Sequence, residues 1–259
     1  KLGKSLGLLV GALVIGTAFP HLIKGLTSTL HWKIVLWSTS SLAFVGGLLM
    51  FTLVPNGPYR KPGQKLDLSA FFKVFENRDF RSAAFGYFGH MWELYAFWAF
   101  VPVILTTYAD VHPESIPNVP FLSFSIIGIG GIACVIGGYV SLKAGAKKTA
   151  AVALLLSCLC CVASPLMLGS DSIIIIVAFL LFWGMVVVAD SPLFSTLVAR
   201  NAPAESKGTA LTIVNCIGFS ITIISIQILV ALKDFINPTY LFLILALGPF
   251  LGLMALYRK

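Results

Sequence analysis

Eight long, continuously apolar runs, separated by short polar breaks, dominate this sequence. They cover about residues 5–25, 33–54, 82–108, 119–141, 149–169, 172–198, 209–232 and 238–257. Each is close to the roughly 20 residues that an α-helix needs to cross a hydrocarbon core of about 30 Å. Strands of a membrane barrel would instead alternate apolar and polar residues over about ten positions. The runs therefore predict an all-α, polytopic membrane protein with eight transmembrane helices.

The composition agrees with a chain that lies in a bilayer. Of 259 residues, 58% are hydrophobic and 11% are charged, and the mean hydropathy is +0.95. This leaves too little polar surface to cover a soluble globule of the same size. The first run lacks a small-residue cleavage pattern and is followed at once by another span, so we do not interpret it as a signal peptide.

Basic residues are divided unequally between the two sides of the predicted spans. Of the 18, only Lys24, Lys33 and Lys233 fall on one side. The other side holds Lys1, Lys4, Arg60, Lys61, Lys65, Lys73, Arg78, Arg81, Lys143, Lys147, Lys148, Arg200, Lys207, Arg258 and Lys259. Because basic loops stay in the cytoplasm, we expect an inner (plasma) membrane protein with both chain ends cytoplasmic. The cations are dispersed over five segments, which argues against a nucleic-acid-binding surface.

The five cysteines all lie inside predicted spans. They are Cys134, Cys158, Cys160, Cys161 and Cys216. With no histidine near them at metal-ligand spacing, they indicate small packing residues and not a disulfide or zinc framework. We expect no metal and no cofactor.

The longest polar interruption, residues 55–81, leaves two spans before it and six after. Prolines and glycines end the preceding helix, and basic residues hold this loop at the cytoplasmic face. Apolar residues at helical spacing over 68–80 indicate an interfacial helix or a connector that packs on the helix ends. We therefore expect three regions: 1–54, the central loop 55–81, and a six-helix half at 82–259.

The starts of two spans resemble each other. GKSLGLLVGALVIG (3–16) and GTALTIVNCIGFS (208–220) share a G-x-x-L element, and each is followed by one last span. If the first pair of helices corresponds to the final pair, a half contains six helices. Four helices are then expected to precede Lys1.

The loop GYVSLKAGAKKTA (138–150) has the spacing of a G-x-x-x-D-R-x-G-R-R element. The matching residues are Gly138, Lys143, Gly145, Lys147 and Lys148, and Leu142 stands at the acidic position. With this loop and this order of spans, the chain resembles the major facilitator superfamily of secondary transporters, as helices five to twelve of its twelve-helix fold. The resemblance implies that the loop belongs to a cytoplasmic gate, without the acid of the gating ion pair.

Two further stretches, 77–105 and 189–212, look like segments of bacterial members that are grouped with nitrate and cyanate transporters. Nitrate carriers have glycine-rich fifth and eleventh helices and an arginine in the eighth. The span 119–141 contains no arginine, and glycines are sparse in the spans 5–25 and 209–232. We therefore do not expect nitrate as the substrate.

Glu93 and Asp190 are the acids within the predicted spans, and no Lys or Arg accompanies them. At about 1.5 Å per residue, Glu93 lies roughly 18 Å from Arg81, and Asp190 lies roughly 15 Å from Arg200, so their depths are comparable. A charged group that faces lipid costs at least about 2.5–3.5 kcal/mol at mid-helix. Both acids should therefore face protein or a hydrated cavity. The resemblance implies that their helices, the seventh and tenth, line the central path.

Desolvation favours a protonated carboxyl group, and hydration favours release of the proton. We therefore expect Glu93 to couple transport to protons or to bind substrate, with His90 as its tuner and Asp190 second. The alternative is that Glu93 forms a structural ion pair with an arginine on an absent helix, and that His90 is simply its hydrogen-bonded neighbour. For Asp190, the alternative is that its carboxylate accepts hydrogen bonds from backbone N–H groups at a local break of the helix, where Ser191 and Pro192 follow.

Four other residues are candidates for the lining of a cavity: Trp92, Tyr95, Trp183 and Asn215. Aromatic packing and helix-to-helix hydrogen bonds are the commoner roles of such residues. His90 and Glu93 have metal-ligand spacing, but two ligands on one helix do not make a site.

The sequence thus predicts a secondary active transporter of a small solute, which works in a lipid bilayer by alternating access with proton coupling. A channel or an intramembrane enzyme that uses Glu93 and Asp190 is the alternative. We do not expect an enzyme, because the chain contains no H-E-x-x-H and no G-x-S-x-G sequence. We expect that the chain does not transport without the four helices before Lys1.

Overall fold

The computed structural model describes residues 2–27, 29–55, 74–112, 118–204 and 207–258, and the regular elements within these ranges are all helical. They are α1 (Leu2–Leu26), α2 (Lys33–Leu53), α4 (Arg78–Val111), α5 (Val119–Ala144), α6 (Ala146–Leu168), α7 (Ile173–Ala189), α8 (Ser191–Asn201), α9 (Lys207–Leu232), α10 (Pro238–Leu241), the 3₁₀ helix η1 (Phe242–Ala246) and α11 (Leu247–Tyr257). In this part of the chain, eight helical segments are long and apolar enough to cross a membrane. The predicted all-α, membrane-spanning fold class is confirmed.

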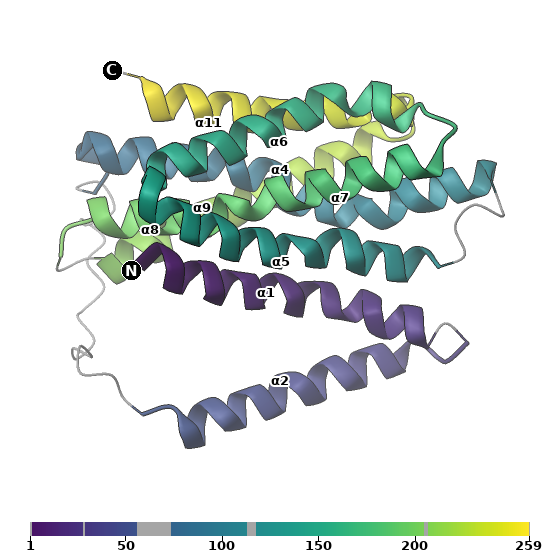
Figure 1. The fold of residues 1–259 in the computed structure, drawn as a ribbon, viewed down its shortest axis with the longest axis horizontal. Helices are drawn as coiled ribbons and strands as arrows, with labels where there is room; N and C mark the ends of the chain where they lie inside the picture. Colours follow the sequence, from purple (N-terminus) through teal and green to yellow (C-terminus); the bar gives the residue numbers. More distant parts are fainter. Residues whose placement is uncertain (1, 28, 56–73, 113–117, 205–206, 259) are drawn as a thin grey trace.

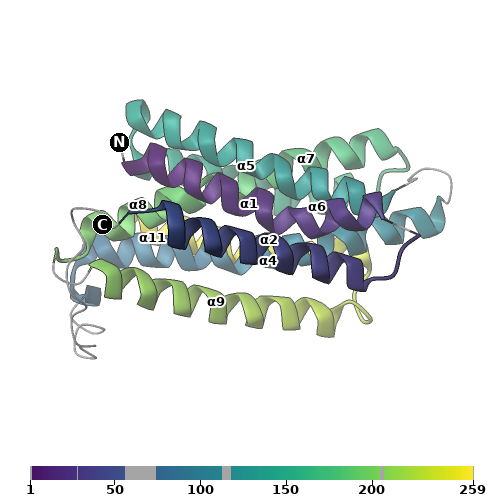
Figure 2. The same cartoon turned by 90° about the horizontal axis from the view of Figure 1, so that it is seen from below.

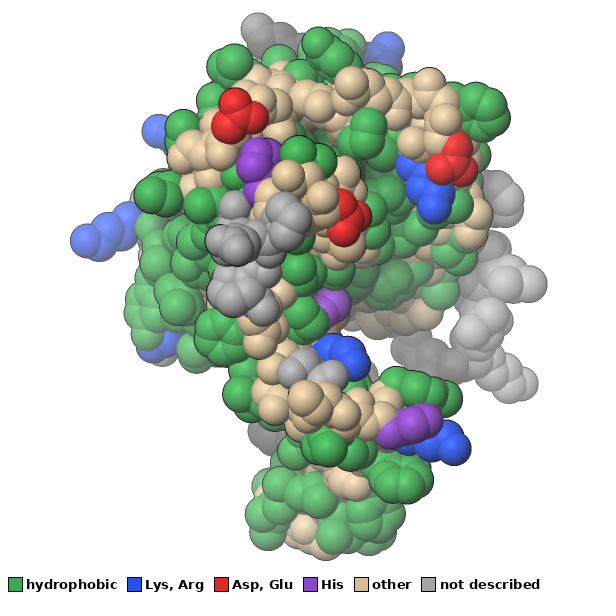
Figure 3. Space-filling view, turned by 90° about the vertical axis from the view of Figure 1, so that its right-hand side faces the viewer, with side chains coloured by type: hydrophobic (Ala, Val, Ile, Leu, Met, Phe, Trp, Pro, Cys, Tyr) green, Lys and Arg blue, Asp and Glu red, His purple; other side chains and the backbone are tan. Residues whose placement is uncertain are grey.

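The helices run roughly side by side, and the two chain ends lie at the same end of the bundle (Figure 1). The α5–α6 turn, the α8–α9 connection and the start of α4 lie there as well. These segments carry most of the described basic residues, so we refer to this end of the bundle as the basic end. Figure 3 views the opposite end, where charged side chains are few and hydrophobic side chains cover the flanks.

Small residues bring α1 against α5 along most of its length, and the two helices lie side by side in both views (Figures 1 and 2). A Cβ atom on Gly11 would lie 2.7 Å from the carbonyl oxygen of Gly131, and one on Gly7 would lie 2.7 Å from that of Cys134. Only glycine permits such an approach of two backbones. This contact attaches α1 to the six-helix part of the chain.

In contrast, α2 has no buried residue within the described ranges, and it projects from the bundle (Figures 1 and 3). Most of its apolar side chains are exposed, and Phe51 is 88% exposed. A surface this apolar is stable only against lipid or another protein segment.

The predicted span 172–198 is divided into α7 and α8 at Asp190. Pro192 has no N–H, so it cannot bond the carbonyl group of Val188 four residues earlier. Cys134 of α5 supplies a donor instead, since its Sγ lies 3.3 Å from that oxygen.

The predicted interfacial helix over 68–80 falls largely outside the described residues. Its last residues belong to α4, which begins at Arg78, where the side chain of Asn77 accepts a hydrogen bond from the Phe80 N–H. The predicted last span, 238–257, is also interrupted, because η1 lies between α10 and α11.

Candidate functional site

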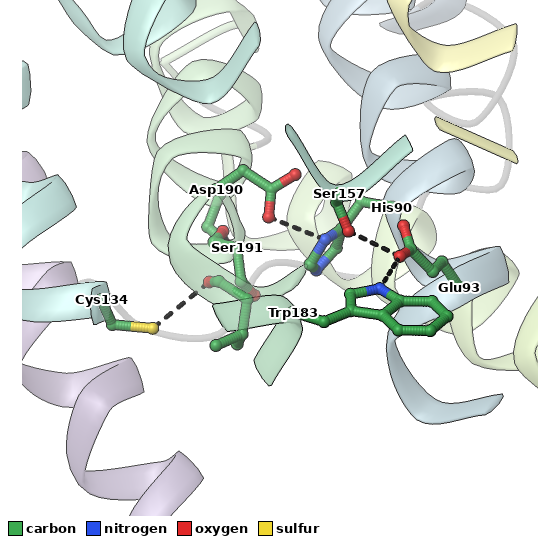
Figure 4. Close-up of polar contacts among 9 residues, drawn as sticks. His90, Glu93, Cys134, Ser157, Trp183, Asp190 and Ser191 are labelled. Carbon is green, nitrogen blue, oxygen red and sulfur yellow. Dashed lines mark hydrogen bonds and ion pairs between the residues drawn. The ribbon is translucent and has the colours of Figure 1, made fainter. Parts of the chain in front are cut away.

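Glu93 lies in the middle of α4, and its side chain points between α6 and α7 (Figure 4). The residue is 1% exposed. Its Oε1 atom accepts three hydrogen bonds: from Ser157 Oγ at 2.5 Å, from Trp183 Nε1 at 2.6 Å and from Cys161 Sγ at 3.2 Å. Within the described ranges, no Lys or Arg forms an ion pair with it. Neutral donors alone therefore surround this carboxyl group.

The positions of these donors follow from helix geometry. Ser157 and Cys161 are four residues apart on α6, so they share one face. Trp183 comes from α7, and its ring packs at 4.5 Å from the ring of Phe97 and at 5.4 Å from that of Phe179, measured between centroids. The indole N–H is thus held toward Glu93 by aromatic packing.

A second acidic group lies next to this cluster. His90, one turn before Glu93 on α4, has its Nδ1 atom 2.9 Å from Asp190 Oδ1, and both residues are 1% exposed (Figure 4). The contact is close, but neither Asp190 oxygen has a partner with good hydrogen-bond geometry in the described part of the chain. His90 Nε2 also has no partner there. The pair is thus buried and incompletely bonded.

This arrangement differs from the expectation that His90 is the hydrogen-bonded neighbour of Glu93. The imidazole turns to Asp190 because the α7–α8 break brings that carboxylate against α4. Asp190 makes no side-chain capping hydrogen bond to α8 by standard geometry, but the backbone N–H groups of Asp190 and Ser191 lie close enough to its carboxylate to stabilise it. The alternative that this carboxylate satisfies backbone donors at the break therefore stays a prediction.

Of the four candidate lining residues, Trp183 is the one that donates a hydrogen bond to Glu93. Trp92 donates from Nε1 to the Ile244 carbonyl oxygen in η1 at 3.2 Å, and the ring of Tyr95 packs against the ring of Phe219 on α9, with 5.5 Å between their centroids. Asn215 is exposed on α9. Trp92 and Tyr95 therefore hold helices together in this conformation.

In the G-x-x-x-D-R-x-G-R-R-like element, Gly138 is buried between helices, whereas the lysines are exposed. Gly138 is buried in α5, where a Cβ atom would lie 2.9 Å from the Gly3 carbonyl oxygen of α1. Gly145 ends α5 with φ +85°, a conformation that favours glycine. Lys143, Lys147 and Lys148 are exposed at the basic end.

Ser157 and Cys161 are not among the residues predicted for the site, because cysteines in apolar spans most often serve as small packing residues. A usable signal was present: two small donors four residues apart at the centre of an apolar span. Among the described residues, no group of three His, Cys, Asp or Glu is arranged to hold a metal ion.

Comparison with known proteins identifies one family. The family model described as Major Facilitator Superfamily matches residues 1–226. No curated protein sequence matches the chain.

Proposed function

This chain belongs to the Major Facilitator Superfamily, a family of membrane transporters, and we propose that it moves a small solute by alternating access with proton coupling at Glu93. The observation that carries the coupling is the surroundings of this carboxyl group. It is buried at mid-helix and accepts hydrogen bonds from three neutral donors. An acid inside a membrane protein is costly, and its usual role is in a substrate or proton pathway.

The three donors suit a group that changes its charge. Ser157, Trp183 and Cys161 direct partial positive charge at one oxygen, so they stabilise the carboxylate without a fixed cation. A fixed Lys or Arg would instead keep the group ionised in every state. In the proposed cycle, Glu93 takes up a proton when water reaches the site from one side and releases it when water enters from the other.

The His90–Asp190 pair is the second candidate in this proposal. His90 lies on α4 with Glu93, and Asp190 lies at the α7–α8 break, so a movement of α7 past α4 changes the surroundings of both acidic groups together. We propose the basic end as the cytoplasmic end, supported by the positive-inside rule.

We further propose that four more helices, before Lys1, complete the transporter. The exposed apolar surface of α2 supports this, as does the likeness of residues 3–16 to 208–220. We expect no solute-driven proton movement in proteoliposomes that contain the 259-residue chain alone, and clear movement when the four helices are present. The assay follows internal pyranine fluorescence after addition of each of a panel of small solutes, with nitrate and cyanate included. Equal activity of the 259-residue chain would rule out the need for further helices.

Alternating access also predicts that water reaches the Glu93 site in part of the cycle. Cys161 is a natural reporter, because its Sγ lies 3.2 Å from Glu93 Oε1. In a variant with the other four cysteines replaced by Ser or Ala, we expect a water-soluble methanethiosulfonate to label Cys161 slowly, and faster with a transported solute. Mass spectrometry measures the labelled fraction, with the same variant unfolded in detergent as the fully accessible reference. Complete protection of Cys161 at every pH and with every solute would exclude a hydrated path at this site.

A further inference from the structure

A cavity of about 700 Å³ lies at the basic end, away from Glu93. Five helices border it: α4 and α6 near their starts, and α5, α8 and α11 near their ends. The cations on its lining are Lys147, Lys148 and Arg200, and the acid is Asp79. Three positive charges and one negative charge give the lining a net charge of +2.

The three cations are not neutralised by neighbouring acids. Within the described ranges, none of them forms an ion pair with a carboxylate. Lys147 Nζ lies 5.7 Å from the centroid of the Tyr257 ring, a cation–π contact across the rim between α6 and α11. Arg200 is followed by Asn201, whose Nδ2 donates to the Asp79 carbonyl oxygen at 3.4 Å, so the end of α8 is attached to α4 beside the cavity.

The start of α6 adds donors to the same cavity. Residues 145–148 line it, and Gly145, the N-cap residue, provides no side chain to cap the helix. The first N–H groups of a helix have no acceptor within the helix, and the helix dipole adds partial positive charge at this point. Acidic residues are absent from the first turn of α6. The N-terminus of α6 and three side-chain cations therefore border the same cavity.

We propose that this cavity, which we name the basic-end site, binds a phosphate group. A phosphate has several oxygens that can engage lysine, arginine and helix N–H groups at once, and the combination of a helix N-terminus with basic side chains is a common phosphate site. The cavity volume exceeds that of a single halide ion and leaves room for the rest of a phosphorylated molecule. The phosphate comes from an anionic phospholipid headgroup or from a soluble phosphate compound.

The test measures thermal unfolding of the purified chain in dodecyl maltoside, followed by tryptophan fluorescence. One series adds sodium phosphate, with sodium chloride at equal ionic strength as reference. The other adds dioleoylphosphatidylglycerol to the micelles, with dioleoylphosphatidylcholine as reference. A ligand of the folded state raises the unfolding temperature. We expect a rise with at least one probe: with the lipid alone for a headgroup site, and with phosphate for a soluble ligand.

The variant Lys147→Gln/Lys148→Gln/Arg200→Gln is expected to weaken the apparent affinity by at least about tenfold, as expected for lost hydrogen bonds to a charged group. Its matched control, Lys24→Gln/Lys33→Gln/Lys233→Gln, removes the same charge from the opposite end and is expected to bind as the unaltered chain does. If the first triple variant does not fold, Lys148→Gln replaces it, with Lys148→Arg expected to restore binding. Lack of response to both probes, or equal loss in both triple variants, would overturn the proposal.

Discussion

Exchange of Glu93 for Gln is expected to lower proton-coupled transport by about 100-fold or more, the lower end of what a positioned proton-transferring group contributes. Glutamine has nearly the same shape, and its amide oxygen can still accept hydrogen bonds from Ser157 and Trp183. It cannot release a proton at any pH. The variant should therefore fold normally and should no longer respond to an imposed pH difference.

The measurement is solute-driven pyranine fluorescence in proteoliposomes that contain the active form of the transporter. Glu76→Gln is the control, since it makes the same chemical change at an exposed residue of the basic end. Glu93→Asp should retain part of the coupling, because it keeps a carboxyl group with a shorter reach. Unchanged pH-dependent transport by Glu93→Gln would remove this residue as the proton site, whatever the role of His90 and Asp190.

The sequence predicts the number of spans well, because the bilayer imposes a single length requirement on each apolar run. The sequence is a poorer guide to where a helix is interrupted within a span. The span 172–198 is mostly apolar, and at its break the Val188 carbonyl oxygen, which Pro192 cannot bond, accepts a hydrogen bond from Cys134, 54 residues earlier in the chain. A donor on another helix cannot be inferred from the pattern of one span.

From the sequence, the burial of the two acids in the candidate site could be predicted, but their hydrogen-bond partners could not. Burial of Glu93 and Asp190 follows from the cost of an acid in lipid. Which groups contact them depends on how α4, α6 and α7 are rotated about their axes, and this rotation is set by packing. The i, i+3 spacing of His90 and Glu93 is compatible with a hydrogen bond between them, but Asp190 on a neighbouring helix competes for the imidazole. Likewise, aromatic composition could not distinguish Trp183, which contacts Glu93, from Trp92, which bonds to η1.

A close backbone contact between α7 and α5 holds the helices beside the Glu93 site, and we expect a large effect when it is disturbed. Gly184 follows Trp183 on α7, and a Cβ atom at this position would overlap with the carbonyl oxygen of Ile126 on α5. A carbonyl group of a helix backbone cannot rotate away as a flexible side chain could. Even a methyl group at this position must therefore push α7 away from α5 and shift the indole that donates to Glu93.

We expect Gly184→Ala to destabilise the protein by about 1–3 kcal/mol or more, as overpacking of an interior does, and to lower the unfolding temperature by roughly 5 °C or more. Gly16→Ala is the matched control, because a Cβ atom there has no atom within 4 Å, and alanine is the better helix former. Tryptophan fluorescence during heating measures both variants in the same detergent. Equal unfolding temperatures would mean that α5 and α7 are not in backbone contact at Gly184, and that the Trp183 indole is not held at Glu93 by this packing.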